Sequence, residues 1–467
     1  MEPTQHPVPL TLKLDAIGED FAAFHARFAP LFARSEPCRK SQEYLRALMG
    51  PVERRNGWQM AEAMGDATPD ATQRLLYHAR WSAVGARDLL QDFIAEQFGD
   101  PEAVVVLDDT GFIKKGDASV GVARQYTGTV GKVENCQIGV FISYASARGH
   151  VLLDRALYMP ESWCNDLERR ARAHVPLRVK FHTKPALALR MLRRAWTRGV
   201  PMAWIAGDEA YGDDGKLRSA IDEVGRRYVF TVSCTTKVWT TRPDVAPPAQ
   251  SSGTRMGRPR TRLWLAPGAP ATRTVKEIAT SWPVSQWHRL AIVQGEKGPI
   301  EYDWGCMRVF ERRGGRPAGE SWLLVRRSIS DPSDLAYYLS NAPADTSLET
   351  LAGVASARYT IEQCFEEAKD DVGLDQYEVR TWPSWHRHVT LSMMALAWLA
   401  SVRAKLADPS STLAAAVAEE ERLREEERLR EAAAQAPAGH SPKRGPEAAS
   451  LARFKLLRRG RSLKSAA

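Results

Sequence analysis

The pattern of hydrophobic and polar positions divides the chain near residue 100. Before that point, aromatic residues recur at helical spacing and predict the buried side of a helix: Phe21, Phe24, Phe28 and Phe32. After Pro101, residues 103–107 form a continuous apolar run, which is typical of a strand buried on both faces. The pattern therefore predicts a helical N-terminal region followed by a region built around strands.

The next part of the chain predicts a sheet flanked by helices. Long strands are expected at residues 137–145 and 150–159, and short buried strands at 202–206 and 227–233. A basic amphipathic helix is expected at residues 183–199. Strands followed by alternating helices and strands indicate an α/β fold with a mixed sheet.

A different composition begins near residue 235. Residues 243–261 are rich in Pro, Gly, Ser and Arg, which predicts a loop, and strand-like runs follow at 289–293 and 322–326. Helices are then expected at 354–372 and, more apolar, at 388–406. We interpret the middle segment as a β-rich insertion in the α/β region.

These patterns predict five regions. They are a helical region at 1–100, the first part of the α/β core at 101–234, the insertion at 235–345, the second part of the core at 346–406, and a charged, low-complexity tail at 407–467. Within the tail, residues 419–430 are rich in Glu and Arg, and residues 451–467 carry six basic residues and no acidic one. A solvated tail is favoured there over a DNA-binding or dimerising segment.

The composition narrows the class of protein. The formal net charge is +9, which favours a polyanionic partner without establishing one. Six scattered cysteines fit neither a zinc site nor a disulfide framework, and predict reduced thiols. No secretory signal is visible at the N-terminus, and no apolar run reaches the roughly 18 residues needed to cross a bilayer. We therefore expect a cytoplasmic protein without a membrane partner.

Two segments are candidates for reading DNA. A helix at residues 57–64, a Gly-containing turn and a second helix after Thr68 and Pro69 fit a helix-turn-helix, with Thr68 as N-cap. An ordinary helical hairpin is the alternative, and the sequence slightly favours it. The loop sequence Gly-Arg-Pro-Arg at 257–260 resembles a minor-groove hook, although a solvated basic loop is the simpler interpretation. The side chains that would recognise DNA ends are Gln73, Arg74, Arg80, Arg258 and Arg260.

Acidic residues follow two of the predicted buried strands. Asp108 and Asp109 come directly after the run ending at Leu107, and Asp208 closes the strand at 202–206. Carboxylates are costly to bury without a partner, and sites in open α/β sheets form outside strand ends. A divalent cation between two carboxylates would remove their mutual repulsion, and Mg²⁺ prefers oxygen ligands. Two such ions can activate a nucleophile and stabilise the leaving oxygen of a phosphodiester.

The helix predicted at 354–372 offers a third acid. Its apolar stripe consists of Ile361, Phe365, Ala368 and Val372. Directly beside that stripe lie Arg358, Glu362 and Lys369, so Glu362 could point along the sheet toward the aspartates, flanked by two phosphate-binding cations. An amphipathic surface helix with ion pairs four residues apart is the alternative.

Together these segments resemble the bacterial insertion-sequence transposases of the DDE class, and most closely the insertion-sequence family numbered seven-hundred-and-one. The first aspartate block is Asp-Asp-Thr-Gly-Phe-Ile-Lys-Lys-Gly at 108–116, followed by Arg-Gln-Tyr-Thr-Gly at 124–128. The second block is Ala-Gly-Asp-Glu-Ala-Tyr-Gly at 206–212. The glutamate block runs from 361 to the Trp-Pro-Ser-Trp-His-Arg-His of 382–388.

This resemblance implies an RNase H-like catalytic core and cut-and-paste transposition. It implies two Mg²⁺ ions per active site, replaceable by Mn²⁺, held by Asp109, Asp208 and Glu362. Asp108 stays open as the alternative to Asp109, because neighbouring strand residues point to opposite faces and only one is expected to reach the metals. The cations expected to hold DNA phosphates are Arg358, Lys369, Lys114, Lys115, Arg124 and Arg387.

The implied partner is double-stranded DNA, both the terminal inverted repeats and the target, bound by a homodimer in the synaptic complex at the bacterial nucleoid. Hairpin-forming relatives carry a Tyr-Arg-Glu-Lys signature, in which the Tyr position here holds Ala355. The resemblance therefore supports metal binding and leaves hairpin processing open. Three alternatives remain. They are a metal-dependent nuclease without strand transfer, a domesticated transposase that binds DNA without cutting it, and a metal-free α/β protein whose acidic strand ends are ordinary loop residues.

Overall fold

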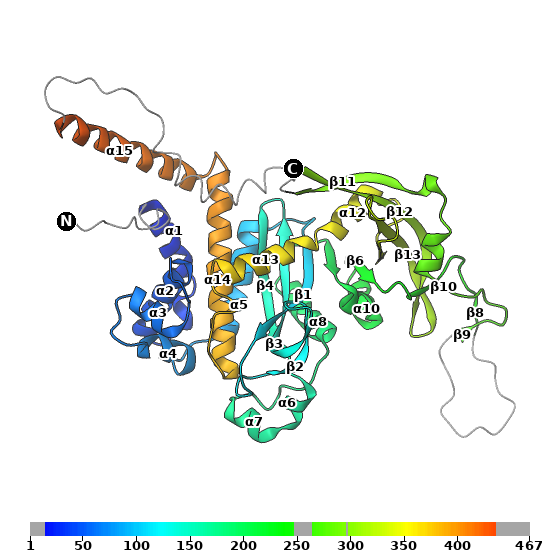
Figure 1. Ribbon diagram of the computed structural model, residues 1–467, viewed down its shortest axis with the longest axis horizontal. Coiled ribbons are helices and arrows are strands. Elements are labelled where there is room, and N and C mark those ends of the chain that lie inside the picture. The colour runs from blue at the N-terminus through cyan, green and yellow to red at the C-terminus, as the bar shows by residue number, and fades with distance from the viewer. Residues whose placement is uncertain (1–14, 247–263, 296–297, 436–467) are drawn as a thin grey trace.

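A large mixed sheet runs through the middle of the computed structural model, which describes residues 15–246, 264–295 and 298–435 (Figure 1). Its strands are β1 (Val104–Ile113), β2 (Ala123–Thr127), β3 (Lys132–Ser146), β4 (Gly149–Leu157), β5 (Trp204–Gly207), β6 (Arg227–Val232), β7 (Lys237–Trp239), β10 (Arg273–Thr274), β11 (His288–Gly295), β12 (Gly298–Arg313), β13 (Arg316–Arg327) and β14 (Leu335–Ser340). A separate small ribbon pairs β8 (Val245–Ala246) with β9 (Trp264–Leu265).

The sheet has the topology expected of an RNase H-like core. Strands β1, β3 and β4 are antiparallel neighbours, whereas β5 and β6 run parallel to β1 on its other side. The full order is β10-β7-β12-β13-β14-β6-β5-β1-β3-β2, with β4 also on β3 and β11 on β12. The predicted α/β fold with a mixed sheet flanked by helices is confirmed. The strands β1, β3, β5 and β6 all lie where the apolar runs predicted them, although β1 and β3 are longer.

The N-terminal helices pack directly against the core. They are α1 (Asp15–Ala26), α2 (Ser35–Met49), α3 (Gly57–Ala63), α4 (Asp70–Tyr77) and α5 (Ala83–Phe98), with the 3₁₀ turn η2 (Ala29–Leu31) between α1 and α2. Phe21, Phe24 and Phe28 are buried as predicted, while Phe32 is half-buried and stacks on Trp81. These helices share one continuous hydrophobic core with the sheet. The region predicted at 1–100 is therefore not spatially separate.

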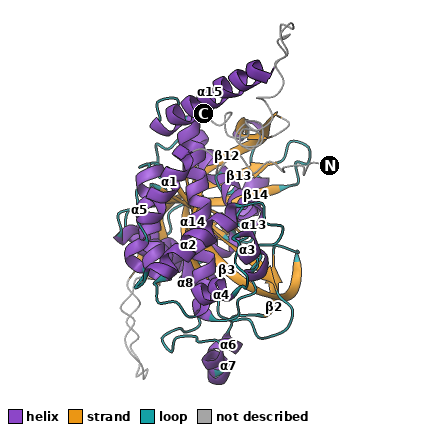
Figure 2. Ribbon diagram, turned by 90° about the vertical axis from the view of Figure 1, so that its left-hand side faces the viewer, coloured by secondary structure: helices purple, strands orange, loops and turns teal. Residues whose placement is uncertain are grey.

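Helix α14 (Trp382–Ala407) is the axis of this packing. It contacts α2, α4, α5 and β4, and the Tyr44 hydroxyl lies 2.8 Å from Nδ1 of its His388. By length and apolar composition, α14 is the one helix of the described residues that could cross a membrane, but 72% of its most apolar stretch is buried inside the protein. Figure 2 shows α1, α2, α5 and α14 in front of the sheet.

The remaining helices lie along the sheet and at its ends. They are α6 (Glu161–Asn165), α7 (Leu167–Arg172), α8 (Lys184–Thr197), α9 (Glu209–Gly212), α10 (Gly215–Glu223), α11 (Val275–Thr280), η3 (Val284–Gln286), α12 (Leu348–Ser356), α13 (Tyr359–Asp370) and α15 (Thr412–Gln435). Two predictions need correction. The single helix expected at 354–372 is two, because the chain breaks at Ala357 and Arg358 between α12 and α13. Helix α14 begins six residues before 388, at a capping box made by Thr381 and Ser384.

The predicted insertion continues the core sheet. Strand β14 pairs with β6, and β13, β12 and β7 follow outward, so residues of the insertion and of the core belong to one sheet. Its far end has a second apolar cluster that includes Val238, Ile278, Val309, Leu323 and Leu339. The insertion therefore lies at one end of the molecule and the N-terminal helices at the other (Figure 1).

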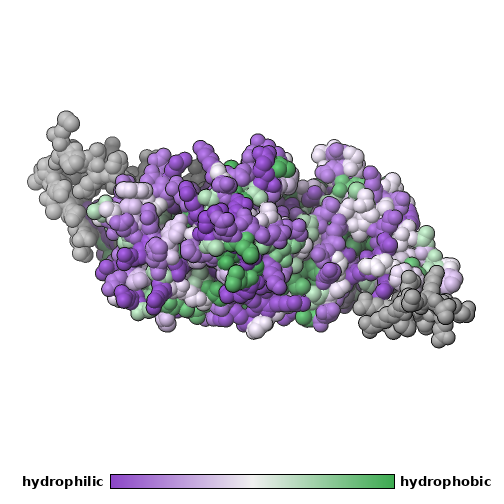
Figure 3. Space-filling view, turned by 90° about the horizontal axis from the view of Figure 1, so that it is seen from below, coloured by the Kyte–Doolittle hydropathy of each residue, from purple (hydrophilic) through white to green (hydrophobic). Residues whose placement is uncertain are grey.

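The lower face of the molecule is mostly hydrophilic. Seen from below, polar side chains cover most of the face and one apolar patch lies near its middle (Figure 3). Elements α6, α7 and β2 lie at this lower end of the molecule (Figure 1). All six cysteines are free, as the scattered spacing predicts.

Candidate active site

The first and second acidic blocks meet at neighbouring strand ends. Strand β1 pairs in parallel with β5, with Val106 opposite Ala206 and Leu107 opposite Gly207. Continuing this register by one residue brings Asp108 level with Asp208, whose backbone is still extended. Residues that are level in a parallel pair point to the same face of the sheet. The register thus places the carboxylates of Asp108 and Asp208 on one face, and Asp109 on the other.

The two faces are covered by different helices. On the Asp108 face, Phe365 of α13 packs edge-on against Phe141, which is paired with Asp108 across β1 and β3. Lys369 of the same helix donates a hydrogen bond to Thr110 Oγ1, two residues along from Asp108. Helix α13, which carries Glu362, therefore lies over the face that holds Asp108.

The surroundings of Asp108 destabilise its charged form. Burial raises its pKa, and the charge of Asp208 raises it further, to about 7, while Arg358 acts in the opposite direction. One of its oxygens accepts the backbone N–H of Asp109 at 2.7 Å. A carboxyl that is half protonated at neutral pH beside a second carboxylate is the situation that a divalent cation relieves. Its oxygen donors also fit Mg²⁺.

Asp109 has a different partner on the opposite face. Lys184, the first residue of α8, donates a hydrogen bond from Nζ to Asp109 Oδ2 at 2.9 Å. Burial raises the pKa of Asp109, and Lys184 opposes that rise. Asp109 is thus paired with a lysine, although burial and the charge of Asp208 still leave its pKa raised.

Asp208 caps the short helix α9. Its Oδ1 accepts the backbone N–H of Ala210 at 3.0 Å, which leaves the other oxygen for a ligand. The buried hydroxyl of Tyr211 lies in the field of all three aspartates, and burial together with these charges raises its pKa well above 10. Asp208 therefore lies at the C-terminal end of β5, where the strand passes into α9.

Glu362 lies near this pair without joining it. Its side chain is half-exposed and accepts a hydrogen bond from Arg358 Nη2 at 3.0 Å, the ion pair four residues apart that was the alternative interpretation. Among residues 15–246, 264–295 and 298–435, no group of three or more His, Cys, Asp or Glu side chains is close enough to hold a metal ion. The structure therefore brings Asp108 and Asp208 together, with Glu362 on the helix above them.

Three of the predicted phosphate-binding cations make contacts within the protein. Lys114 donates to the carbonyl of Tyr377 and lies 3.6 Å from the centre of that ring, and burial lowers its pKa to about 8. Arg387 donates to the carbonyls of Leu76 and Ala79. Arg387 thus holds the end of α4 against α14, and these contacts occupy the guanidinium group that was predicted to bind phosphate. Lys369 is half-buried against Thr110 but lies beside the acidic pair.

The other predicted DNA contacts are on the surface. The exposed ones are Lys115, Arg124, Gln73, Arg74 and Arg80. Helices α3 and α4 form the predicted pair, but α4 begins at Asp70 with Pro69 as N-cap, so Thr68 does not cap it. Arg258 and Arg260 lie outside the described residues.

Two residues of the site were missed from the sequence. Lys184 was noted only as part of a basic helix, and nothing in the local pattern indicates that it reaches Asp109, 75 residues earlier. Tyr211 stands three residues after Asp208 in the second acidic block, and that spacing alone could have identified it.

Comparison with known proteins fits this geometry. The family model described as DDE superfamily endonuclease matches residues 27–299, which is more than half of the chain. The chain belongs to the DDE superfamily of endonucleases. The matched segment contains both acidic strand ends and ends before Glu362, so the third acid of this DDE endonuclease rests on its place in the structure.

Individual relatives are more distant. The chain is 23% identical over 175 residues to the probable transposase for insertion sequence element IS701 of Microchaete diplosiphon, an alignment that covers 37% of this chain and 43% of that relative. The chain thus matches less than half the length of this relative. The structure of a piggyBac transposase synaptic complex with hairpin DNA aligns over 96% of this chain and 87% of that one, at 11% identity and a TM-score of 0.39. A similarity at that level carries no conclusion about this protein.

Proposed function

We propose that this DDE endonuclease is the transposase of a bacterial insertion sequence, which cleaves DNA at the element's ends and joins the freed ends to target DNA. The observation that carries the proposal is the register of β1 against β5, which aligns Asp108 with Asp208 beneath α13. The similarity to a transposase of element IS701 supports the choice of substrate. Its place of action would be the cytoplasm, on chromosomal DNA.

We assign the metal ligands as Asp108, Asp208 and Glu362. This assignment takes the alternative to Asp109, because Asp109 faces away and is paired with Lys184. Two Mg²⁺ ions, or Mn²⁺ in their place, would activate the attacking oxygen and stabilise the leaving oxygen. Glu362 would reach them by releasing Arg358, which is a change of side-chain rotamers at an exposed position.

The cations around the acids would hold the DNA backbone. Arg358, once free of Glu362, and Lys369 lie on the metal-facing side and would grip the phosphates next to the scissile bond. Lys115, just after the end of β1, and Arg124, on β2, are exposed and would contact the flanking duplex. The exposed side chains of α4, Gln73 and Arg74, would read the element's end in a synaptic homodimer.

Joining of DNA ends tests this function. The full chain is incubated with Mg²⁺ or Mn²⁺, labelled DNA from either flank of its coding sequence, and a target plasmid, beside Asp208→Ala. We expect joined products with the wild-type protein and none with the variant. Cleavage without joining would show a nuclease instead, and binding without cleavage a DNA-binding protein. Equal activity of Asp208→Ala would refute the mechanism.

A further inference from the structure

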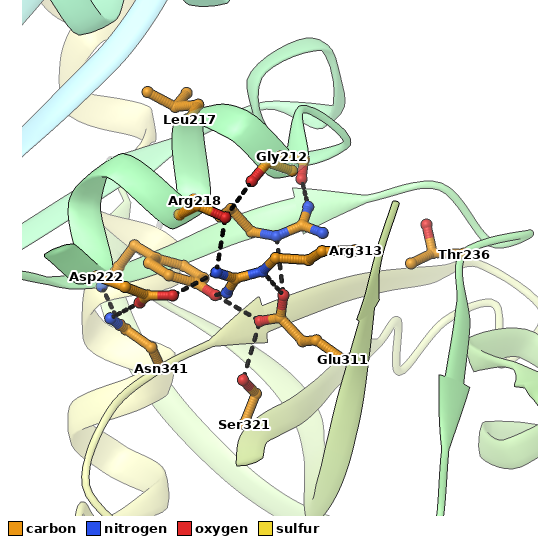
Figure 4. Close-up of polar contacts among 12 residues, drawn as sticks. Gly212, Leu217, Arg218, Asp222, Thr236, Glu311, Arg313, Ser321 and Asn341 are labelled. Atoms are coloured by element: carbon orange, nitrogen blue, oxygen red, sulfur yellow. Dashed lines mark hydrogen bonds and ion pairs between the residues drawn. The ribbon is translucent and has the colours of Figure 1, made fainter. Parts of the chain in front are cut away.

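A buried charge network ties the insertion to the core. Glu311 of β12 is fully buried, and its carboxylate receives hydrogen bonds from Arg218 Nε at 3.0 Å, Arg313 Nε at 2.8 Å and Ser321 Oγ at 2.9 Å, and one from the Tyr228 hydroxyl. Figure 4 shows both arginines at one oxygen of the carboxylate and Ser321 at the other. Burial by itself would raise the pKa of Glu311, but the two arginines hold it below its ordinary value. The network is therefore charged and fully paired.

One of the two arginines continues toward the acidic site. Arg218 Nη1 donates a hydrogen bond to the carbonyl of Gly212, the last residue of α9. Arg313 turns the other way, to Asp222 and to the hydroxyl of Tyr228. Of the two guanidinium groups, Arg218 thus forms the contact between the insertion and α9.

Helix α9 has little freedom to move independently of this contact. A Cβ on Gly212 would lie 1.8 Å from the carbonyl oxygen of Thr231, so α9 lies flush against β6. Asp213, the next residue, accepts hydrogen bonds from Ser233 N and Thr236 Oγ1. At its other end, α9 donates the Ala210 N–H to the Asp208 carboxylate. A shift of the Gly212 end would therefore move the carboxylate at the start of the same single turn.

We propose that Arg218 and Glu311 are positioning residues that set the Asp208 carboxylate for metal binding, so that the insertion supports the active site from behind. The proposal rests on the proposed function through the role of Asp208 as a metal ligand. Supports of this kind behind a metal ligand contribute about 10–100-fold to metal affinity or activity.

The chain offers a matched pair of variants. Arg218→Lys keeps a positive charge beside Glu311 but loses the second arm that reaches Gly212. Arg313→Lys removes the same kind of buried contact with Glu311 and leaves Gly212 untouched. Glu311→Gln keeps the shape of the side chain and removes its charge, and it keeps the test open if Arg218→Lys does not fold. Thermal unfolding of each variant identifies a temperature at which the wild type and all variants are folded, and binding is measured there.

The measurement is Mn²⁺ binding by the full chain with duplex DNA, followed through the electron paramagnetic resonance signal of free Mn²⁺. We expect Arg218→Lys and Glu311→Gln to weaken binding about 10–100-fold, and Arg313→Lys to leave it within threefold of wild type. Backbone hydrogen exchange at Tyr211 and Gly212 should be faster than in the wild type for Arg218→Lys. For Arg313→Lys it should be unchanged.

The outcomes separate the two proposals. If wild type binds no more Mn²⁺ than Asp208→Ala, the metal site itself is refuted. If wild type binds Mn²⁺ and Asp208→Ala does not, but Arg218→Lys and Arg313→Lys bind equally well, the network only fastens the insertion and the positioning role is overturned.

Discussion

Two adjacent aspartates in this DDE endonuclease face different neighbours. Asp108 faces Asp208 and α13, whereas Asp109 faces α8 and is paired with Lys184. The cause is the alternation of side chains along β1, which sends neighbours to opposite faces of the sheet. The consequence is that their substitutions should have separable effects.

Asp108→Asn should abolish DNA cleavage, because it removes a residue that we propose as a metal ligand. Asp109→Asn should reduce cleavage by about 10–100-fold, because it acts through Lys184 and the strand behind the site. The comparison is made from cleavage rates at saturating Mg²⁺, with Lys184→Met as a second probe of the Asp109 pair. If Asp109→Asn is inactive and Asp108→Asn retains cleavage, the assignment of the two residues is reversed.

The raised pKa of Asp108 predicts a pH dependence of stability in metal-free protein. The folded protein keeps the Asp108 proton up to about pH 7, whereas the unfolded chain loses it near the ordinary value of 3.8. The free energy of unfolding should therefore fall as pH rises between these two values, by up to about 1.4 kcal/mol per pH unit from this group, and not change further above pH 7. Urea unfolding at a series of pH values, in the presence of a chelator, measures this change in the free energy of unfolding.

Asp108→Asn is the control for that slope, because the amide cannot titrate. The difference in unfolding free energy between the wild type and the variant should shrink as the pH is lowered toward 4. A difference that stays constant from pH 4.5 to pH 8 would mean that Asp108 is ionised throughout.

The sequence predicts only some of the residues of the candidate site. Asp208 and the blocks that contain the aspartates were identified from apolar runs that end in acids. The resemblance favoured Asp109 over Asp108, whereas we propose Asp108. The sequence could not decide between them, because the choice depends on the register of β1 against β5, a pairing of residues 100 positions apart. For the same reason the partner of Arg387 was missed, since its contacts with Leu76 and Ala79 join opposite ends of the chain.

At the scale of elements, helix α13 shows what periodicity can and cannot predict. Its apolar stripe of Ile361, Phe365, Ala368 and Val372 is buried as predicted. The break from α12 was not predicted, since neither Gly nor Pro marks it. The stripe fixes which side of α13 faces the sheet, and so places Lys369 against Thr110, on the face of the sheet that holds Asp108.

Phe365→Ala should destabilise the protein by about 3–5 kcal/mol, because it empties a buried site where the ring packs 5.5 Å from that of Phe141. Glu366→Ala, one residue along on the exposed side of α13, should change the unfolding free energy by less than about 0.5 kcal/mol. Urea denaturation compares them. A loss below about 1 kcal/mol for Phe365→Ala would mean that α13 is not held by this stripe.

At the scale of the whole molecule, the five predicted regions are joined more closely than composition suggests. The N-terminal helices share the core of the sheet through α14, and the insertion shares the sheet itself through β14 and β6. Sequence composition detects where a pattern changes, but it does not show that two segments pair edge to edge. The sheet continuity also explains how residues of the insertion can reach the turn that follows Asp208.

Because β14 of the insertion pairs with β6 of the core, the described regions should unfold together. Calorimetry should show one transition with equal calorimetric and van't Hoff enthalpies, although the insertion has an apolar cluster of its own. Leu323→Ala, at a fully buried position of that distant cluster, should lower the melting temperature of the entire transition and speed hydrogen exchange in α14. Two separate transitions, with only the lower one shifted by Leu323→Ala, would show that the insertion unfolds independently and that its support of Asp208 can be lost while the core stays folded.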